Sequence, residues 1–96
     1  MPLSKLQRKQ LLPRCSSLKP VVMVGAKGVT DAVVAELDVA LSAHELVKVR
    51  VNAADRDERR AMTATLAEGT GSELVHAVGH VVVLYRERPA GERPLP

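Results

Sequence analysis

The chain has 96 residues, a length that suits one domain and is too short for two domains with separate cores. Its single cysteine, Cys15, excludes an intramolecular disulfide and favours a reducing compartment. The first residues lack the unbroken apolar stretch of a signal peptide, and no segment approaches the roughly 20 apolar residues of a membrane span. We therefore expect a cytoplasmic protein that makes no membrane contact.

The charged residues are unevenly distributed along the chain. The net charge is only +3, but all 11 acidic side chains fall within residues 31–96. The acid-free first part contains Lys5, Arg8, Lys9, Arg14, Lys19 and Lys27. Such a segment is typical of a phosphate-binding surface. From charge alone, a solvated basic helix that only aids solubility is an equal alternative.

The first predicted element is a helix that begins after Ser4, a suitable N-cap. Pro13 and the two serines that follow should end or kink it around residues 12–17. Its apolar contacts should be Leu6, Leu11 and Leu12. Its basic residues are spaced three and four apart, so that one side of the helix presents Lys5, Arg8 and Lys9.

The next segment has the pattern of a right-handed parallel βαβ unit. Residues 21–24 form an apolar run bounded by proline and glycine, which predicts a buried strand. A helix capped by Thr30 or Asp31 should follow and end near Ala43, with His44 and Glu45 closing it. Its predicted core residues are Val33, Leu37, Ala40 and Leu41. Residues 46–51 then alternate, which turns Val47, Val49 and Val51 to the core and Lys48 and Arg50 away from it.

A third helix and a hairpin complete the predicted domain. Asp55 and Glu58 have the spacing of a capping box, and Gly69 or Gly71 should stop this helix after about Glu68. Its predicted buried residues are Met62, Thr65 and Leu66. Strands over 73–78 and 81–86 flank the two-residue loop Gly79-His80, of the II′ kind, and should be antiparallel. The expected fold is a compact α/β sandwich in the order α-β-α-β-α-β-β with a mixed four-stranded sheet over residues 1–87, followed by a disordered tail at 88–96.

The sequence G-A-K-G at positions 25–28 is the most informative motif, because it lies between a predicted strand and a predicted helix. The glycines permit a tight turn and close approach by a ligand, and free amide groups at a helix start attract anions. KH-type domains clamp nucleic-acid backbones with such a GxxG loop. By itself the tetrapeptide is weak, since turns often use glycine for conformational reasons, but its coincidence with the basic segment favours nucleic-acid binding.

Several other binding modes lack the required residues. The chain has no Gly-Lys-Ser/Thr for a P-loop, and Gly25 and Gly28 supply only a fragment of a dinucleotide-binding fingerprint. Tyr85 is the only aromatic residue, which disfavours domains that stack bases on aromatic platforms. Recognition should therefore depend on phosphates, riboses and shape, with a steep salt dependence.

The sequence resembles the CRM domain family, whose bacterial single-domain members are the YhbY-like proteins. The resemblance runs from about Leu3 to Arg86 and is carried by separate blocks in the same order: residues 18–22 leading into Gly25-x-x-Gly28-Val29-Thr30, then residues 44–49, then Gly79-x-x-x-Val83-Leu84-Tyr85-Arg86. His80 departs from the family pattern, which often has a basic or amide residue in that turn. This departure argues against a hairpin contact and leaves the GxxG loop intact.

The resemblance implies a fold similar to the C-terminal domain of translation initiation factor three. It also implies RNA binding and association with ribosomal RNA in precursors of the large ribosomal subunit. The contacts would fall on Gly25, Ala26, Lys27 and Gly28. The basic residues expected to assist them are Lys5, Arg8, Lys9, Lys19, Lys48 and Arg50. We expect a monomer, although the sequence leaves the oligomeric state and the RNA target open.

Two alternatives from other functional classes remain at this stage. The basic first helix could dock an acidic protein partner. An enzyme acting on a small anion would need a pocket with perturbed acids, for which the sequence offers no candidate residues. No cofactor or catalytic residue is expected.

Other candidate residues have simpler interpretations. His44, His76 and His80 match no zinc spacing. The lone Cys15 is expected to be a small, semi-buried residue, since no partner base for a nucleophile can be named. Arg56, Arg59 and Arg60 share one side of the third helix, where interleaved acids favour a salt-bridged solvated face over an RNA contact. Whether that face binds RNA is left open.

Overall fold

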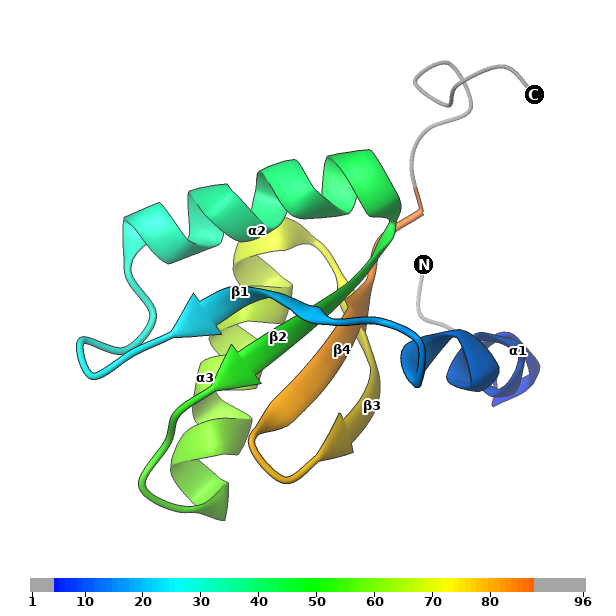
Figure 1. Ribbon diagram of the computed structural model, residues 1–96. Helices are drawn as coiled ribbons and strands as arrows, with labels where there is room; N and C mark the ends of the chain where they lie inside the picture. Colours follow the sequence, from blue (N-terminus) through cyan, green and yellow to red (C-terminus); the bar gives the residue numbers. More distant parts are fainter. Residues whose placement is uncertain (1–4, 88–96) are drawn as a thin grey trace.

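The computed structural model describes residues 5–87 and contains three helices and four strands in the predicted order (Figure 1). The helices are α1 (Lys5–Cys15), α2 (Asp31–His44) and α3 (Arg56–Thr70). The strands are β1 (Pro20–Val24), β2 (Leu46–Val51), β3 (Glu73–Val78) and β4 (Val81–Tyr85). The predicted α/β fold class is confirmed, whereas the Ser4 cap and the 88–96 tail lie outside the described residues.

The four strands form one mixed sheet in the order β1-β2-β4-β3. Strand β1 pairs with β2 in parallel, and the other neighbouring pairs are antiparallel. Helix α2 connects the two parallel strands, as predicted for the βαβ unit. The carboxyl ends of β1 and β2 therefore lie at one edge of the sheet, together with the β3–β4 hairpin.

The main core lies between the sheet and helices α2 and α3. Leu37 and Leu41 of α2 and Leu66 of α3 have no exposed surface. They pack against the alternate valines of β2, Val49 and Val51 among them, as the sequence pattern predicts. Burial of such side chains supplies the largest favourable contribution to folding of a domain this small.

A second, smaller core lies on the opposite face of the sheet, where α1 packs. Its buried members are Cys15, Leu46, Val75 and Val83, with Leu11 packed beside them. Leu6 and Leu12 are 66% and 38% exposed, so their prediction as apolar contacts is wrong. Leu11 and Cys15, four residues apart, face the sheet, where the main contact of α1 is with β3.

Strand β1 is an edge strand, so the prediction that it is buried holds for only one of its two faces. Val22 and Val24 are buried in the main core, but Val21 and Met23 are 55% and 59% exposed. Alternate side chains point to opposite faces of a strand, and α1 does not reach the β1 side of its face. The strand is therefore buried on one side only.

Helix α3 buries Leu66 and packs Met62 against the main core as predicted, but the prediction for Thr65 is wrong. Thr63, Leu66 and Thr70 are buried, whereas Thr65 is exposed. The buried threonines can enter the core because their hydroxyls donate to the backbone carbonyls of Arg59 and Leu66, at 2.7 Å in each case. These internal hydrogen bonds satisfy the polar atoms that burial would otherwise leave unpaired.

The predicted caps of α2 and α3 are confirmed. Thr30 Oγ1 accepts the Val33 amide at 3.2 Å, and Asp55 Oδ1 accepts the Glu58 amide at 2.8 Å. Glu58 reaches back to the Ala54 amide, one residue earlier than in a standard capping box. Gly71, with a φ of 65°, ends α3 in the left-handed conformation that favours glycine.

The two leucine environments give a test of this packing. We expect Leu37→Ala to lower the free energy of unfolding by about 2–5 kcal/mol, because the substitution leaves a cavity in the main core. Leu6→Ala should change it by no more than about 0.5 kcal/mol, as for an exposed side chain. Urea denaturation of both variants measures the difference, and equal losses would contradict the assignment of Leu6 to the surface.

Candidate nucleic-acid interface

The G-A-K-G segment forms an exposed β-turn directly after β1. The Gly28 amide donates to the Gly25 carbonyl at 3.0 Å, which places Ala26 and Lys27 at the tip. Gly28 has a φ of 75°, a conformation that other residues adopt with strain. Neither tip amide donates a hydrogen bond within the described chain, and the Lys27 side chain is exposed. Two adjacent amides and one ammonium group are thus available to an anion.

The start of α2 lies farther along the chain from this turn than the sequence suggests. The helix begins at Asp31, so Val29 and Thr30 separate it from the turn. The Thr30 hydroxyl already accepts the Val33 amide, and Gly28 uses its own amide within the turn. The donors of the turn itself therefore lie at its tip, and two residues separate them from the helix start.

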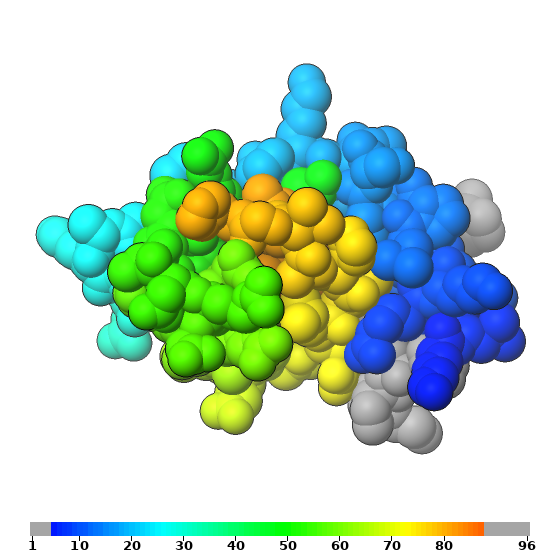
Figure 2. Space-filling model, turned by 90° about the horizontal axis from the view of Figure 1, so that it is seen from below, coloured from blue at the N-terminus to red at the C-terminus, as the bar shows by residue number. Residues whose placement is uncertain are grey.

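Three other segments meet the turn at the same end of the sheet, which we call the loop end: residues 52–55, the first turns of α3 and the hairpin turn 79–80. The Asn52 amide donates to the Val24 carbonyl at 3.1 Å, and the Val51 amide donates to the His80 carbonyl at 2.6 Å. A β-carbon added at Gly28 would lie 3.7 Å from Met62 Cε, which places the turn against α3. In Figure 2 the turn (cyan) projects beyond the green start of α3 and the orange hairpin.

The first turns of α3 bring three arginines to the loop end. Arg56, Arg59 and Arg60 line a groove between α3 and β3, and the Arg59 guanidinium donates to the Gly79 carbonyl of the hairpin turn. None of them forms an ion pair with Asp55, Asp57 or Glu58 in the described part of the chain. The predicted salt-bridged face is therefore wrong. Asp55 and Glu58 instead accept backbone amides at the helix start.

The sequence left open whether these arginines belong to the interface. Their spacing of three and four residues showed that they share one side of the helix, but not that this side lies beside the hairpin turn. The useful signal was the βαβ unit, because parallel strands bring the segments after both of them to one edge of the sheet. Residues that follow β2, Arg56 among them, were therefore bound to lie near the segment that follows β1.

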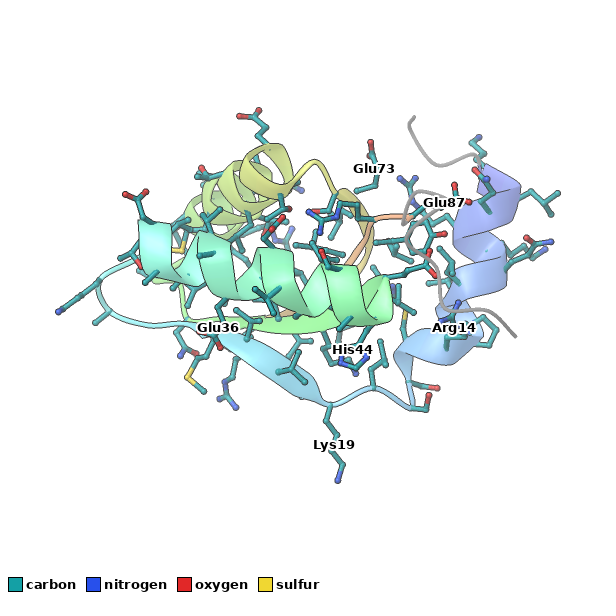
Figure 3. All side chains as sticks on the ribbon, turned by 90° about the horizontal axis from the view of Figure 1, so that it is seen from above. Arg14, Lys19, Glu36, His44, Glu73 and Glu87 are labelled. Atoms are coloured by element: carbon teal, nitrogen blue, oxygen red, sulfur yellow. The ribbon has the colours of Figure 1, made fainter. Side chains whose placement is uncertain are left out.

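The predicted basic residues do not form one surface. Helix α1, with Lys5, Arg8 and Lys9, lies at the opposite end of the molecule from the turn (Figures 1 and 2). Arg8 is half-buried, and its Nε is buried without a hydrogen-bond partner. Lys19 projects outward where the chain enters β1 (Figure 3), about 20 Å along an extended chain from Gly25. These four residues are separated from the loop end.

Lys48 and Arg50 lie on the sheet face that α1 partly covers, as their alternation predicts. Arg50 is exposed near the carboxyl end of β2, opposite Met23 and Val81 in the neighbouring strands. Its Nε donates to Asn52 Oδ1 at 3.4 Å. Lys48 is half-buried two residues earlier and lines a hollow beside Leu12 of α1. Arg50 can therefore join Lys27 at the loop end, whereas Lys48 lies toward the middle of the sheet.

The remaining candidates do not form a reactive site. Cys15 is 4% exposed, and its Sγ donates to the Leu11 carbonyl at 3.5 Å. Burial raises the pKa of its thiol, and the nearby charges of Lys48 and Arg14 oppose this only in part. At neutral pH the thiol is protonated and a poor nucleophile. Between residues 5 and 87, no three histidine, cysteine or acidic side chains gather as metal ligands, and no helix is both long and apolar enough to cross a membrane.

Comparison with known proteins identifies the family. The family model of the CRS1/YhbY (CRM) domain matches residues 3–86 of the sequence. The chain belongs to this family. This CRM domain is 40% identical over 95 residues to a protein of Pseudomonas aeruginosa named as a probable RNA-binding protein, covering 99% of this chain and 91% of the relative. It is 38% identical over 94 residues to an RNA-binding protein of Haemophilus influenzae, covering 98% and 95%.

A solved structure shares the fold of this CRM domain. The solution structure of a candidate RNA-binding protein of Staphylococcus aureus superposes with a TM-score of 0.81 and 32% sequence identity. The match covers 98% of this chain and 99% of the other. The resemblance predicted from the sequence is thereby confirmed over nearly its whole length.

Arg86, the last residue of the block at 79–86, has an internal role. Its guanidinium pairs with Asp38 and donates to the Thr70 carbonyl at 2.8 Å, to the Asp38 carbonyl at 3.0 Å and to Ser42 Oγ at 2.8 Å. The Arg86 side chain is 22% exposed. It therefore fastens the end of β4 to both α2 and the end of α3.

Replacing this guanidinium should affect stability and not binding. We expect Arg86→Gln to lower the free energy of unfolding by about 1–3 kcal/mol, mainly through the lost hydrogen bonds to the Thr70 and Asp38 carbonyls, since the exposed Asp38 carboxylate contributes little. Urea denaturation measures the loss. Nucleic-acid affinity, measured where the variant is folded, should equal that of the parent; weaker binding with unchanged stability would place Arg86 in the interface.

Proposed function

We propose that this CRM domain binds RNA by holding the phosphate backbone at the loop end of its sheet. The observation that carries the proposal is the exposed turn at 25–28, which presents two unused amides and Lys27 at the same end of the sheet as the arginines of α3. Amides and a cation that project from one turn suit a phosphate oxygen. The relatives named as RNA-binding proteins support RNA as the partner.

The loop end is suited to the backbone more than to stacked bases. Tyr85, the chain's one aromatic residue, is half-buried and packs against the second core at the other end of β4. No aromatic ring is therefore available beside the turn to stack an exposed base. Affinity should come from phosphate neutralisation, which releases counterions. The affinity should therefore fall steeply as the salt concentration rises.

The resemblance to YhbY-like proteins supports a more specific role in large-subunit assembly. We propose that the partner is ribosomal RNA in precursors of the large ribosomal subunit, bound by a cytoplasmic monomer without catalysis. In this role Arg50 assists Lys27 at the loop end. The lysines and arginine of α1, together with Lys19 and Lys48, contact more distant parts of a large RNA, because the structure separates them from the turn.

Two substitutions in the turn test the backbone contact. Lys27→Gln removes one charge and should weaken RNA binding, with a decrease of about 0.7 in the slope of log K against log salt. Gly25→Ala should also weaken binding, because the added methyl group blocks the close approach of the RNA backbone. It should not disturb the fold, since the methyl group meets no atom within 4 Å and Gly25 lacks a positive φ. Both variants should keep their unfolding free energy within about 0.5 kcal/mol. Fluorescence anisotropy with labelled RNA measures the affinities.

A matched control separates a local contact from the effect of net charge. Val39→Glu also lowers the net charge by one, at a 69% exposed position on α2. It should leave the affinity close to that of the parent. If Lys27→Gln and Val39→Glu reduce binding equally, the turn is not the contact.

Sucrose-gradient fractionation of cell lysate tests the assembly role. We expect the parent protein to migrate with immature large subunits and the Lys27→Gln, Gly25→Ala double variant to move toward the top of the gradient. Nuclease treatment before centrifugation should release the parent protein. A complex that survives nuclease would instead favour an acidic protein partner docked on α1.

A further inference from the structure

The groove between α3 and β3 is a second feature of the loop end that the turn does not use. Its volume is about 710 Å³, within the range of sites that hold a ligand of nucleotide size. Its floor is apolar and is formed by Ala64 and Ala67 of α3 and by Leu74, Ala77 and Val82 of the sheet. Leu74 remains 38% exposed there. The groove is therefore an open hollow with an uncovered apolar surface.

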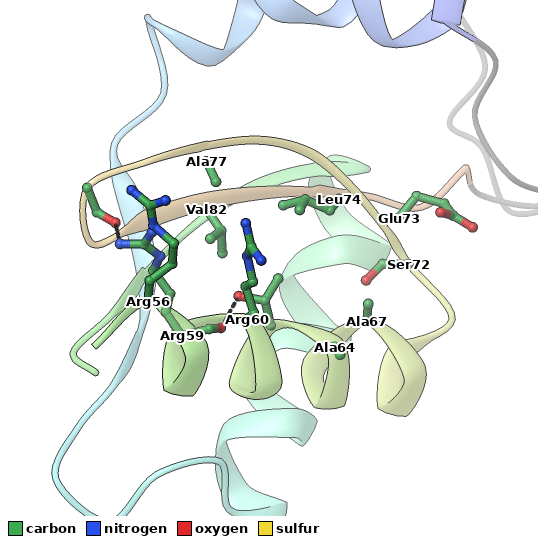
Figure 4. A pocket seen from close by; sticks show the side chains of 12 residues that line it. Arg56, Arg59, Arg60, Ala64, Ala67, Ser72, Glu73, Leu74, Ala77 and Val82 are labelled. Carbon is green, nitrogen blue, oxygen red and sulfur yellow. Dashed lines mark hydrogen bonds between the residues drawn. The ribbon is translucent and has the colours of Figure 1, made fainter. Parts of the chain in front are cut away.

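The charges of this groove are separated along its length. Figure 4 shows Arg56, Arg59 and Arg60 gathered toward the hairpin end, with Glu73 at the far end. Ser72 also lines the far end, but its hydroxyl is shared with Thr70 Oγ1 at 2.8 Å. A ligand lying in the groove would meet positive charge at the loop end and an apolar floor beyond it.

This arrangement of arginines adds little to the stability of the folded chain. Arg56 lies three and four residues from Arg59 and Arg60, so like charges are adjacent on one side of the helix. They also occupy the first turns of α3, where the helix dipole disfavours cations. Only Arg59 has a structural contact, its hydrogen bond to the Gly79 carbonyl. For Arg56 and Arg60 no ion pair or hydrogen bond within the described chain offsets the repulsion.

We propose that the α3–β3 groove is a second RNA site that takes one unstacked nucleotide of a single-stranded segment. Its phosphate would lie between Arg56 and Arg60, and its base would lie on the Ala64–Leu74 floor. The inference rests on the proposed function and extends it, because the turn would hold the neighbouring backbone. Arginine guanidinium planes can stack on bases, so they can replace the aromatic stacking platform that this chain lacks.

A single strand fits the groove better than a duplex. Bases within a duplex are stacked and paired, so they cannot enter a hollow between a helix and a strand. A loop, a bulge or a free strand can place one base there while its backbone stays outside. The guanidinium groups at one end and the apolar floor beyond them match the phosphate and the base of such a nucleotide.

Charge and shape can be tested separately with small substitutions. Arg60→Gln and Arg56→Gln each remove one charge and leave the structural Arg59 in place. Each should weaken binding of a labelled single-stranded RNA of about ten nucleotides and lower its salt slope by about 0.7. Thermal unfolding temperature should stay the same or rise, because repulsion between like charges is relieved. Val39→Glu is the matched control for charge.

Filling the groove tests its shape without changing charge. Ala64→Leu covers the floor, whereas Ala61→Leu makes the same change at an exposed position of the same helix outside the groove. We expect Ala64→Leu to weaken binding of the single strand severalfold and Ala61→Leu to leave it unchanged. A fully paired duplex should bind both variants alike, since it does not enter the groove.

The outcomes distinguish the groove from the turn. If the groove variants bind the single strand like the parent while Lys27→Gln binds weakly, the groove inference is wrong and the proposed function stands. If only the groove variants bind weakly, the turn is not the contact and the groove is the main site. A lower unfolding temperature for Arg56→Gln and Arg60→Gln would show that these arginines have a structural role and would overturn the inference.

Discussion

The parallel pairing of β1 with β2 is the constraint on which the rest of the structure depends. Parallel strands must run in the same direction, so the chain leaves both of them at the same edge of the sheet. The antiparallel return through β4 then places the hairpin turn at that edge as well. A turn, a helix start and a hairpin from three parts of the sequence therefore meet at the loop end, and the basic side chains they carry act on one region of space.

At the loop end, the acidic and the basic side chains have different partners. Carboxylates at the start of α3 accept backbone amides and so stabilise the helix. Most of the guanidinium groups beside them are left to solvent. A domain selected only for stability would distribute these charges differently, with acids and arginines paired along the helix. Here the arginines form no ion pair within the described chain, so their guanidinium groups can contact a partner of negative charge.

The sequence was sufficient for the order of the elements, the two N-caps and the alternation of β2, because each depends on local spacing. It was insufficient for Leu6, Leu12 and Thr65, since burial there depends on how far a neighbouring element extends across the sheet. The G-A-K-G turn was found because glycine marks it locally. That α1 lies far from this turn could not be found, because sequence proximity and shared charge say nothing about which end of a strand an element occupies. The capping role of Asp55 and Glu58 was predicted, but the position of the α3 arginines beside the β3–β4 hairpin was not, because it depends on how the helix packs against the sheet.

The unequal size of the two cores has a consequence for the order in which the domain opens. Ten buried residues form the core between α2, α3 and the sheet, whereas the core beneath α1 has four, one of which is Cys15 of α1 itself. Pro13 also removes one hydrogen-bond donor from the last turn of α1. Helix α1 contributes one buried side chain, against two from α2 and three from α3, so its release would disturb the fewest buried residues of the three helices. Lys5 and Lys9 are therefore carried on the helix that is joined to the sheet by the smallest core.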